Sequence, residues 1–182
     1  KRFFLERIIR EHPHQKILVF VRTKVRAERV LAALGRVELD ARSLHGDKVQ
    51  EERQQVLEAF RKGEVYVLVA TDVSARGIDI AQVDYVVNYD MPEQPENYVH
   101  RVGRTGRGVH KGLAVSFCSE SEVPLLEAIE AYIGQPIDRI MLSKDEYLDT
   151  LDFTAENKYA LNALLKEAVK AQSKRKKKKG KG

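Results

Sequence analysis

Short apolar runs alternate with amphipathic stretches along the first 135 residues. The apolar runs are continuous and rich in β-branched residues, which is typical of strands buried on both faces. The expected strands are 17–21, 42–44, 65–70, 85–88 and 113–118, of which 42–44 is the weakest. The expected helices are 1–11, 24–35, 48–62, 95–102 and 123–133. Strands and helices in this alternation predict an α/β domain, with a mostly parallel sheet and helices on both faces.

Residues typical of helix ends mark several of these boundaries. Thr23 can cap the second helix, which is expected to end at Gly35. Asp47 can cap the third helix, with Gln50 at the position of a capping box, and Gly63 follows its last turn.

The α/β alternation stops after residue 135. Residues 136–157 read as an extended connector, and 158–171 have the spacing of an amphipathic helix. The sequence therefore predicts an α/β domain (1–135), a C-terminal extension with a helix (136–173) and a basic tail (174–182) that is disordered when free.

The charge of the chain is concentrated in that tail. The chain has 182 residues and a formal net charge of +5. Seven of its 32 Lys and Arg residues lie in the tail, which leaves 25 against 27 Asp and Glu elsewhere. Nucleic-acid binding by the α/β domain would therefore need locally placed groups rather than a basic surface.

Composition excludes several other classes of protein. No apolar run is long enough for a membrane-spanning helix, and no signal peptide is predicted, so we expect a cytoplasmic protein without a membrane partner. The single cysteine, Cys118, excludes an internal disulfide and a cysteine-based metal cluster, and we expect it in the core. We expect no metal site. The chain begins with Lys1 rather than Met, so we expect it to be part of a longer protein.

Polar clusters follow the predicted strands and the fourth helix. They are residues 22–24, 45–47, 71–79 and 100–108. In open parallel sheets ligands bind beyond the carboxyl ends of the strands, so these clusters are the candidate site.

Three arginines in the last cluster are spaced by three residues. Arg101, Arg104 and Arg107 would lie along one face if the helix continued, where a multiply charged anion such as a triphosphate would offset their repulsion. The alternative is a solvated basic face whose arginines pair with nearby acids. The candidate acids are Asp72, Asp79 and Glu96.

A nucleotide-binding motif of the chain's own is missing from the sequence. No G-x-x-x-x-G-K-[ST] phosphate loop occurs, and the only Asp-Glu pair lies in the connector at 145–146. The arginines therefore suit a phosphate whose nucleotide and Mg²⁺ another domain holds.

Five motifs, in this order and spacing, resemble one protein family. They are ILVFVRTK (17–24), LHGDKVQEER (44–53), VLVATDVSARGIDI (67–80), VDYVVNYDMP (83–92) and YVHRVGRTGRG (98–108). Over about residues 1–135 the chain resembles the second, C-terminal RecA-like domain of DEAD-box ATP-dependent RNA helicases, most closely the bacterial RhlE type. The histidine at 100 favours this RNA-dedicated branch over DNA-unwinding relatives, which remain an alternative.

The resemblance implies a role for individual residues. Arg104 and Arg107 match arginine fingers on the γ-phosphate of ATP, and Asp79 matches a carboxylate that binds the ribose. His100 and Arg101 match residues that couple the nucleotide cleft to the other domain and to RNA. The positions that match contacts to the RNA backbone are Arg22, Gly46, Gln50, Arg53 and Thr71. The role of Arg76 is left open, with an internal salt bridge as one reading.

The resemblance also implies the cofactor and the partners. ATP with Mg²⁺ would be held mainly by the N-terminal RecA-like domain of the same protein, and RNA would bridge both domains. The fragment alone is expected to be inactive. The physical alternatives remain a plain capping box for Gln50, a pair with Glu58 or a neighbour for Arg53, and a non-catalytic RNA-binding fragment that acts through its basic tail.

Overall fold

The computed structural model describes residues 1–75, 80, 83–105 and 112–141. The chain divides into two compact units, Lys1–Gly134 and Gln135–Gly182. In the second unit only residues 135–141 are described, so the expected extension helix and basic tail lie outside the described residues. None of the helices in the described ranges has the length and apolar character needed to cross a membrane.

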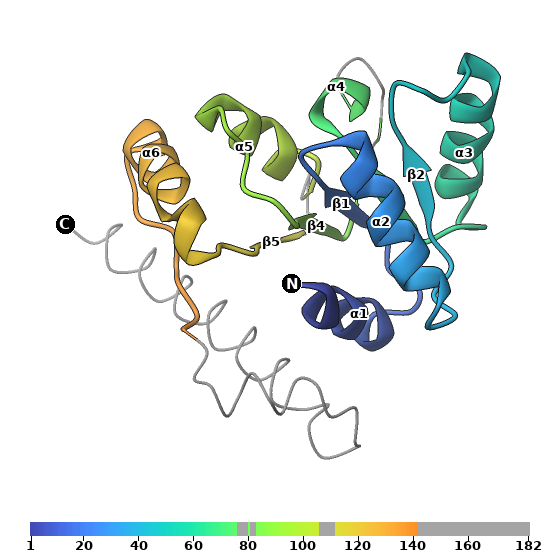
Figure 1. The fold of residues 1–182 in the computed structure, drawn as a ribbon, viewed down its shortest axis with the longest axis horizontal. Helices are drawn as coiled ribbons and strands as arrows, with labels where there is room; N and C mark the ends of the chain where they lie inside the picture. The colour runs from blue at the N-terminus through green and yellow to red at the C-terminus, as the bar shows by residue number, and fades with distance from the viewer. Residues whose placement is uncertain (76–79, 81–82, 106–111, 142–182) are drawn as a thin grey trace, which may run out of the picture. The chain divides into compact units, whose positions relative to one another are not determined.

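The first unit is built on a five-stranded parallel sheet (Figure 1), as the alternating pattern predicted. Its order is β2-β3-β1-β4-β5. The strands are β1 (Ile17–Phe20), β2 (Arg42–Leu44), β3 (Val67–Ala70), β4 (Tyr85–Asn88) and β5 (Leu113–Ser116). The strands that the sequence placed at 17–21, 65–70 and 113–118 are therefore shorter by one or two residues.

Helices cover both faces of this sheet. They are α1 (Arg2–Glu11), α2 (Lys24–Gly35), α3 (Gln50–Lys62), α4 (Asp72–Ala75), α5 (Pro95–Val102) and α6 (Val123–Ile133), with a 3-10 turn at Glu120–Glu122. The connection through α2 crosses from β1 to β2, and that through α3 returns to β3. Because both crossovers are expected to be right-handed, they lie on opposite faces.

The core on the α3 face shows why the strands are apolar throughout. Leu57 and Phe60 of α3 pack with the alternate residues of the strands, among them Leu18, Phe20 and Leu68. All of these side chains are buried. The residues between them point to the other face, which is why an alternating polar pattern is absent.

Two expectations about local structure were wrong. Asp47 does not cap α3: the helix begins at Gln50 after Val49, without a side-chain cap, and Asp47 instead pairs with Lys24. Cys118 is exposed and lies two residues beyond the end of β5 at Ser116. Thr23 does cap α2, since its hydroxyl accepts a hydrogen bond from the backbone N–H of Arg26 at 3.1 Å.

Candidate functional site

The carboxyl ends of four neighbouring strands lie at one edge of the sheet. The last residue of β1, Phe20, is in register with Ala70 of β3 and Asn88 of β4, and Ala70 is in register with Leu44 of β2. The segments that follow therefore begin side by side. This register brings Arg22, Gly46 and Thr71 to one edge, although they are far apart in the sequence.

Arg101 is buried at this edge of the sheet, where its guanidinium makes several hydrogen bonds. Its side chain is 2% exposed and extends from α5. Its Nε and Nη2 donate to the two carboxylate oxygens of Asp72 at 2.6 and 2.8 Å, and its Nη1 donates to Asn88 Oδ1 and the carbonyl of Asp90 at 3.1 and 2.9 Å. The guanidinium carbon lies 5.0 Å from the centre of the Phe20 ring. All three guanidinium nitrogens are thus engaged within the domain.

The condition for a row of three arginines on one helix, that α5 continues past Val102, is not met. Helix α5 ends at Val102, so Arg104 lies in the turn beyond it. Arg101 pairs with Asp72, as the alternative reading proposed. Arg107 and Asp79 lie outside the described residues, as does Arg76.

A small hollow brings three of the predicted site residues together. His100 is exposed on α5, and Arg104 is partly buried. The carbonyl of Arg104 accepts a hydrogen bond from Val83 N at 3.1 Å, which ties the turn to the segment before β4. The residues that line the hollow are Phe20, Asp72, Ala75, Asn97, His100, Arg101 and Arg104.

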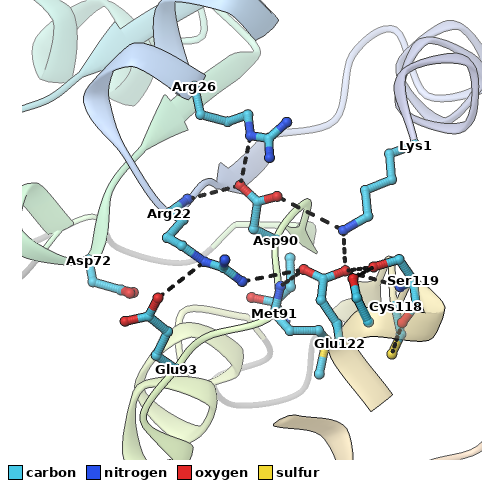
Figure 2. A network of polar contacts seen from close by, with 12 residues as sticks. Lys1, Arg22, Arg26, Asp72, Asp90, Met91, Glu93, Cys118, Ser119 and Glu122 are labelled. Atoms are coloured by element: carbon cyan, nitrogen blue, oxygen red, sulfur yellow. Dashed lines mark hydrogen bonds and ion pairs between the residues drawn. The ribbon is translucent and has the colours of Figure 1, made fainter. Parts of the chain in front are cut away.

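Arg22, which follows β1, belongs to a network of charges (Figure 2). Its backbone N–H donates to Asp90 Oδ2 at 3.0 Å. Its guanidinium lies 3.5 Å from a carboxylate oxygen of Glu93 and 3.6 Å from one of Glu122, and its side chain is 42% exposed. Arg26 also approaches Asp90, at 3.5 Å. The backbone of Arg22 is therefore fixed while its guanidinium faces solvent.

Glu122 anchors the far side of this network. It accepts hydrogen bonds from Lys1 Nζ, from the backbone N–H of Met91 at 3.2 Å, and from the backbone N–H and hydroxyl of Ser119 at 3.0 and 2.7 Å. Burial alone would raise its pKa, but the hydrogen bonds from Lys1 and Ser119 lower the pKa to about 2. Glu122 was missed in the sequence, although the spacing Ser119-x-x-Glu122 is the signal of a capping box, which the structure forms.

The loop after β2 and the first turn of α3 form the other half of the site. Gly46 is exposed, and a Cβ added there would meet nothing within 4 Å, so the packing of the domain does not require glycine at this position. Arg53 Nη1 donates to Gln50 Oε1 at 3.2 Å, so Arg53 pairs with a neighbour other than Glu58, and Gln50 does not act in a capping box. Among the residues that the structure describes, the buried Arg53 Nε has no hydrogen-bond partner.

Thr71 is more enclosed than its place at a strand end predicted. Its side-chain oxygen lies 3.0 Å from Ser74 Oγ, and its backbone N–H donates to the same atom at 3.1 Å. Ser74 Oγ also donates to the carbonyl of Leu44 at 2.6 Å. Ser74 therefore links the ends of β2 and β3.

Comparison with known proteins identifies the domain. Residues 1–109 match the family described as helicase conserved C-terminal domain. The chain belongs to this family. The RNA helicase RhlB of Psychromonas ingrahamii, described as ATP-dependent, is 44% identical over 152 residues, which are 84% of this chain and 36% of that protein. The chain thus spans about a third of the length of that relative.

Solved structures place this helicase C-terminal domain among the DEAD-box proteins. Escherichia coli SrmB, a DEAD-box protein solved with the regulator of ribonuclease activity A, matches with a TM-score of 0.72 and 36% identity over 77% of this chain and 83% of that one. Saccharomyces cerevisiae Dbp5 bound to RNA and ADP BeF3 matches with a TM-score of 0.74 and 32% identity over 92% and 42%. The RecA-like fold that the motifs implied is confirmed.

Proposed function

We propose that this helicase C-terminal domain is the second RecA-like domain of an ATP-dependent RNA helicase of the bacterial RhlE type, which works in the cytoplasm and unwinds or remodels short RNA duplexes. The observation that carries the proposal is the shared edge of β1–β4, where the hollow beside Arg104 and the exposed groups around Arg22 and Gly46 lie on one support. The five motifs support the RhlE type.

The described residues fit the anionic end of a nucleotide. His100 and Arg104 line the hollow, and guanidinium and imidazole groups suit phosphate oxygens. Within the described ranges, no group of three or more His, Cys, Asp or Glu side chains could hold a metal ion. Because the sequence has no phosphate loop, ATP with Mg²⁺ would rest mainly on the N-terminal RecA-like domain, and bound ATP would supply the free energy of hydrolysis for the cycle.

The residues of this domain would act on the phosphate by charge and position. Arg104, with Arg107 from the adjoining motif, would meet the γ-phosphate when the two domains close. Arg101 itself, fully engaged with Asp72, Asn88 and the Asp90 carbonyl, would hold α5 and the following turn in place. Asp79 matches the family position that binds the ribose.

RNA would bind through its sugar–phosphate backbone, which fixes position without reading sequence. The Gly46 loop, Gln50 and Arg53 at the start of α3, and exposed Arg22 offer hydrogen-bond donors and positive charge. Thr71 would contribute from the neighbouring strand end. Dbp5, which has the same fold, was solved with RNA and ADP BeF3, and this supports both ligands. Two ligands that both favour the closed state would shift the population of domain arrangements toward it.

The test is the RNA-stimulated ATPase rate of the full-length protein. Arg104→Ala and Arg107→Ala are each expected to lower kcat by ~10³-fold or more, the range of an arginine finger. Exposed Arg36, which follows α2, provides the control Arg36→Ala with unchanged kcat. If kcat in both finger variants stays within two-fold of that of the unaltered protein, the loss is far smaller than expected and this assignment is wrong.

A second candidate function rests on the tail. Seven cations within residues 174–181 suit a non-catalytic RNA-binding role. Deleting residues 174–182 from the full-length protein would then lower the salt dependence of RNA binding by up to ~5 in log–log slope, at roughly 0.7 per phosphate contact. Full retention of ATPase activity with a lowered slope would assign the tail to affinity and the domain to catalysis.

A further inference from the structure

Two side chains of α2 hold the residues on either side of Gly46. Lys24 Nζ lies 2.8 Å from a carboxylate oxygen of Asp47. Glu28 Oε1 lies 2.8 Å from His45 Nε2. Lys24 and Glu28 are one helical turn apart, so they project from the same side of α2. Gly46 therefore sits between two tethers that start from one rigid helix.

Glu28 also fixes the end of β2. The hydroxyl of Ser43 donates to Glu28 Oε1 at 2.6 Å, so Ser43 and His45 converge on the same oxygen. The hydrogen bond from Ser43, and then that from His45, lower the pKa of Glu28. The acceptor side chain is 53% exposed, whereas His45 is 9% exposed. A surface carboxylate is thus held by two donors from the strand that leads to Gly46.

The ring of His45 depends on this contact. An ionised carboxylate can only accept a hydrogen bond, so His45 Nε2 carries the proton that lies between them. His45 Nδ1 is buried and has no hydrogen-bond partner. Glu28 is consequently the one polar group that orients the imidazole within the described residues. The carbonyl of His45 accepts from Lys48 N at 3.2 Å and closes the turn around Gly46.

We infer that Glu28 is a positioning residue that holds the Gly46 loop in the shape needed to present its backbone N–H groups to an RNA phosphate. This inference rests on the proposed RNA-binding function and names a residue outside all five motifs. A loop ordered in advance loses less conformational entropy when the phosphate binds. Lys24 supports the other flank through an exposed ion pair, which salt screens.

The direction in which RNA affinity changes on substitution distinguishes a positioning role from a simple effect of charge. Glu28 is a negative charge on the helix that grips the RNA-binding loop. Removing a negative charge there should tighten RNA binding if charge alone matters. Glu28→Gln removes the charge and keeps an oxygen that can accept from Ser43 and His45. Glu28→Ala removes the charge and the acceptor, so comparing the two variants isolates the hydrogen bonds.

The experiment measures the Kd of the full-length protein for a short single-stranded oligouridylate, with Mg²⁺ and a non-hydrolysable ATP analogue. Glu28→Gln is expected to bind as tightly as the unaltered protein or more tightly. Glu28→Ala is expected to bind roughly five-fold more weakly, the effect of about one hydrogen bond. The matched control is Glu58→Ala, which removes an exposed glutamate from α3 and should not weaken binding.

A second readout distinguishes positioning from a general loss of structure. Single phosphates of the oligonucleotide are replaced in turn by neutral methylphosphonates. The unaltered protein should lose affinity when the phosphate opposite Gly46 is replaced, and Glu28→Ala should lose less at that phosphate and the same amount at the others. A loss that is equal at every phosphate would mean that Glu28 acts on the fold rather than on this contact, and would overturn the inference.

The outcomes also separate this inference from the proposed function. If the unaltered protein binds no RNA, the proposed function fails and the inference fails with it. If the unaltered protein binds RNA and Glu28→Ala binds as tightly as Glu28→Gln, only the inference fails. Should Glu28→Ala lower the melting temperature more than Glu58→Ala, Ser43→Ala repeats the test by removing one donor to Glu28. It should weaken binding, but less than Glu28→Ala does because the contact between His45 and Glu28 remains, and unchanged binding would overturn the inference.

Discussion

Arg101 and Arg22 lie at the same edge of the sheet and share Asp90, but their surroundings differ. Arg101 is 2% exposed and uses all three guanidinium nitrogens on Asp72, Asn88 and the Asp90 carbonyl. Arg22 is 42% exposed, and its guanidinium lies 3.5 Å or more from its two acid partners. One arginine is part of the packing, and the other is available to a ligand.

The difference shows how burial assigns roles to identical side chains. A buried charge must keep its partners, because leaving one unpaired is costly, whereas an exposed pair contributes little and exchanges readily. The backbone of Arg22 is nevertheless fixed by its hydrogen bond to Asp90. Asp90 therefore fixes the backbone of Arg22, while the guanidinium stays exposed and loosely paired with Glu93 and Glu122, an arrangement that suits the proposed contact with a phosphate.

The largest expected effect comes from breaking the buried site. Arg101→Leu leaves the Asp72 carboxylate and Asn88 Oδ1 without the donor they share, so we expect a loss of about 3–5 kcal/mol in the free energy of unfolding. Urea denaturation of this chain at neutral pH measures it. Arg22→Leu is the matched control and should change the free energy of unfolding by less than about 0.5 kcal/mol. Equal losses in the two variants would contradict the division of roles.

This contrast also marks how far the sequence could predict the site. The alternation of apolar and amphipathic segments was enough to predict the parallel sheet. The rule that ligands bind beyond strand ends was enough to predict that Arg22, Gly46 and Thr71 lie at one edge of it. The end of α5 at Val102 was predicted from the pattern, but spacing alone could not show that Arg101 turns inward to Asp72. That pair joins residues 29 positions apart, which a local pattern does not contain.

The tethers of the Gly46 loop were missed for a similar reason. Asp47 has the residue type of a helix cap, but it pairs with Lys24 across 23 positions, and Glu28 reaches Ser43 and His45 on another element. Each partner is an ordinary surface residue in the sequence. Only the crossing of α2 over the sheet brings them together.

Glu122 contacts Arg22, and its contribution to the free energy of unfolding should depend on pH. Its pKa of about 2 lies below the ordinary value of 4.5, so its stabilisation is present above about pH 4.5 and is lost as the pH falls toward 2. Glu122→Gln should lose about 2 kcal/mol at pH 7 through its weaker hydrogen bonds. Denaturation of this chain between pH 7 and pH 2 should show the difference from the unaltered chain shrinking with acid. Exposed Glu120→Gln is the control, and a difference independent of pH would contradict the assignment.

A smaller effect is expected at the start of α2, immediately after Arg22. Thr23→Ala removes the hydroxyl that accepts from Arg26 N, and losing an N-cap typically costs about 1 kcal/mol. Thr23→Ser keeps the acceptor and should restore most of the stability in urea denaturation. If Thr23→Ala also weakens RNA binding by the full-length protein, the position of the Arg22 guanidinium depends on an intact start of α2. If RNA binding is unchanged, the hydrogen bond from Arg22 N to Asp90 is sufficient to position the arginine.

Substitution of Arg22 should have the smallest effect on stability and a clear effect on RNA binding. Arg22→Gln should leave the free energy of unfolding within about 0.5 kcal/mol, because it removes only exposed, loosely paired charge. In the full-length protein it should lower the salt dependence of RNA binding by roughly 0.7 in log–log slope, the value for one phosphate contact on a single strand. The measurement is a salt titration of the Kd.

Glu93→Gln provides the opposite change at the same contact. Glu93 is 65% exposed and lies 3.5 Å from Arg22, so it competes with a phosphate for that guanidinium. Its removal should tighten RNA binding in the unaltered background and have no effect once Arg22 is already glutamine. The two substitutions would then be coupled, as expected for neighbours that share one partner. Additive effects of Arg22→Gln and Glu93→Gln on the Kd would mean that Arg22 contacts no phosphate. Arg22 would then differ from Arg101 only in its exposure to solvent.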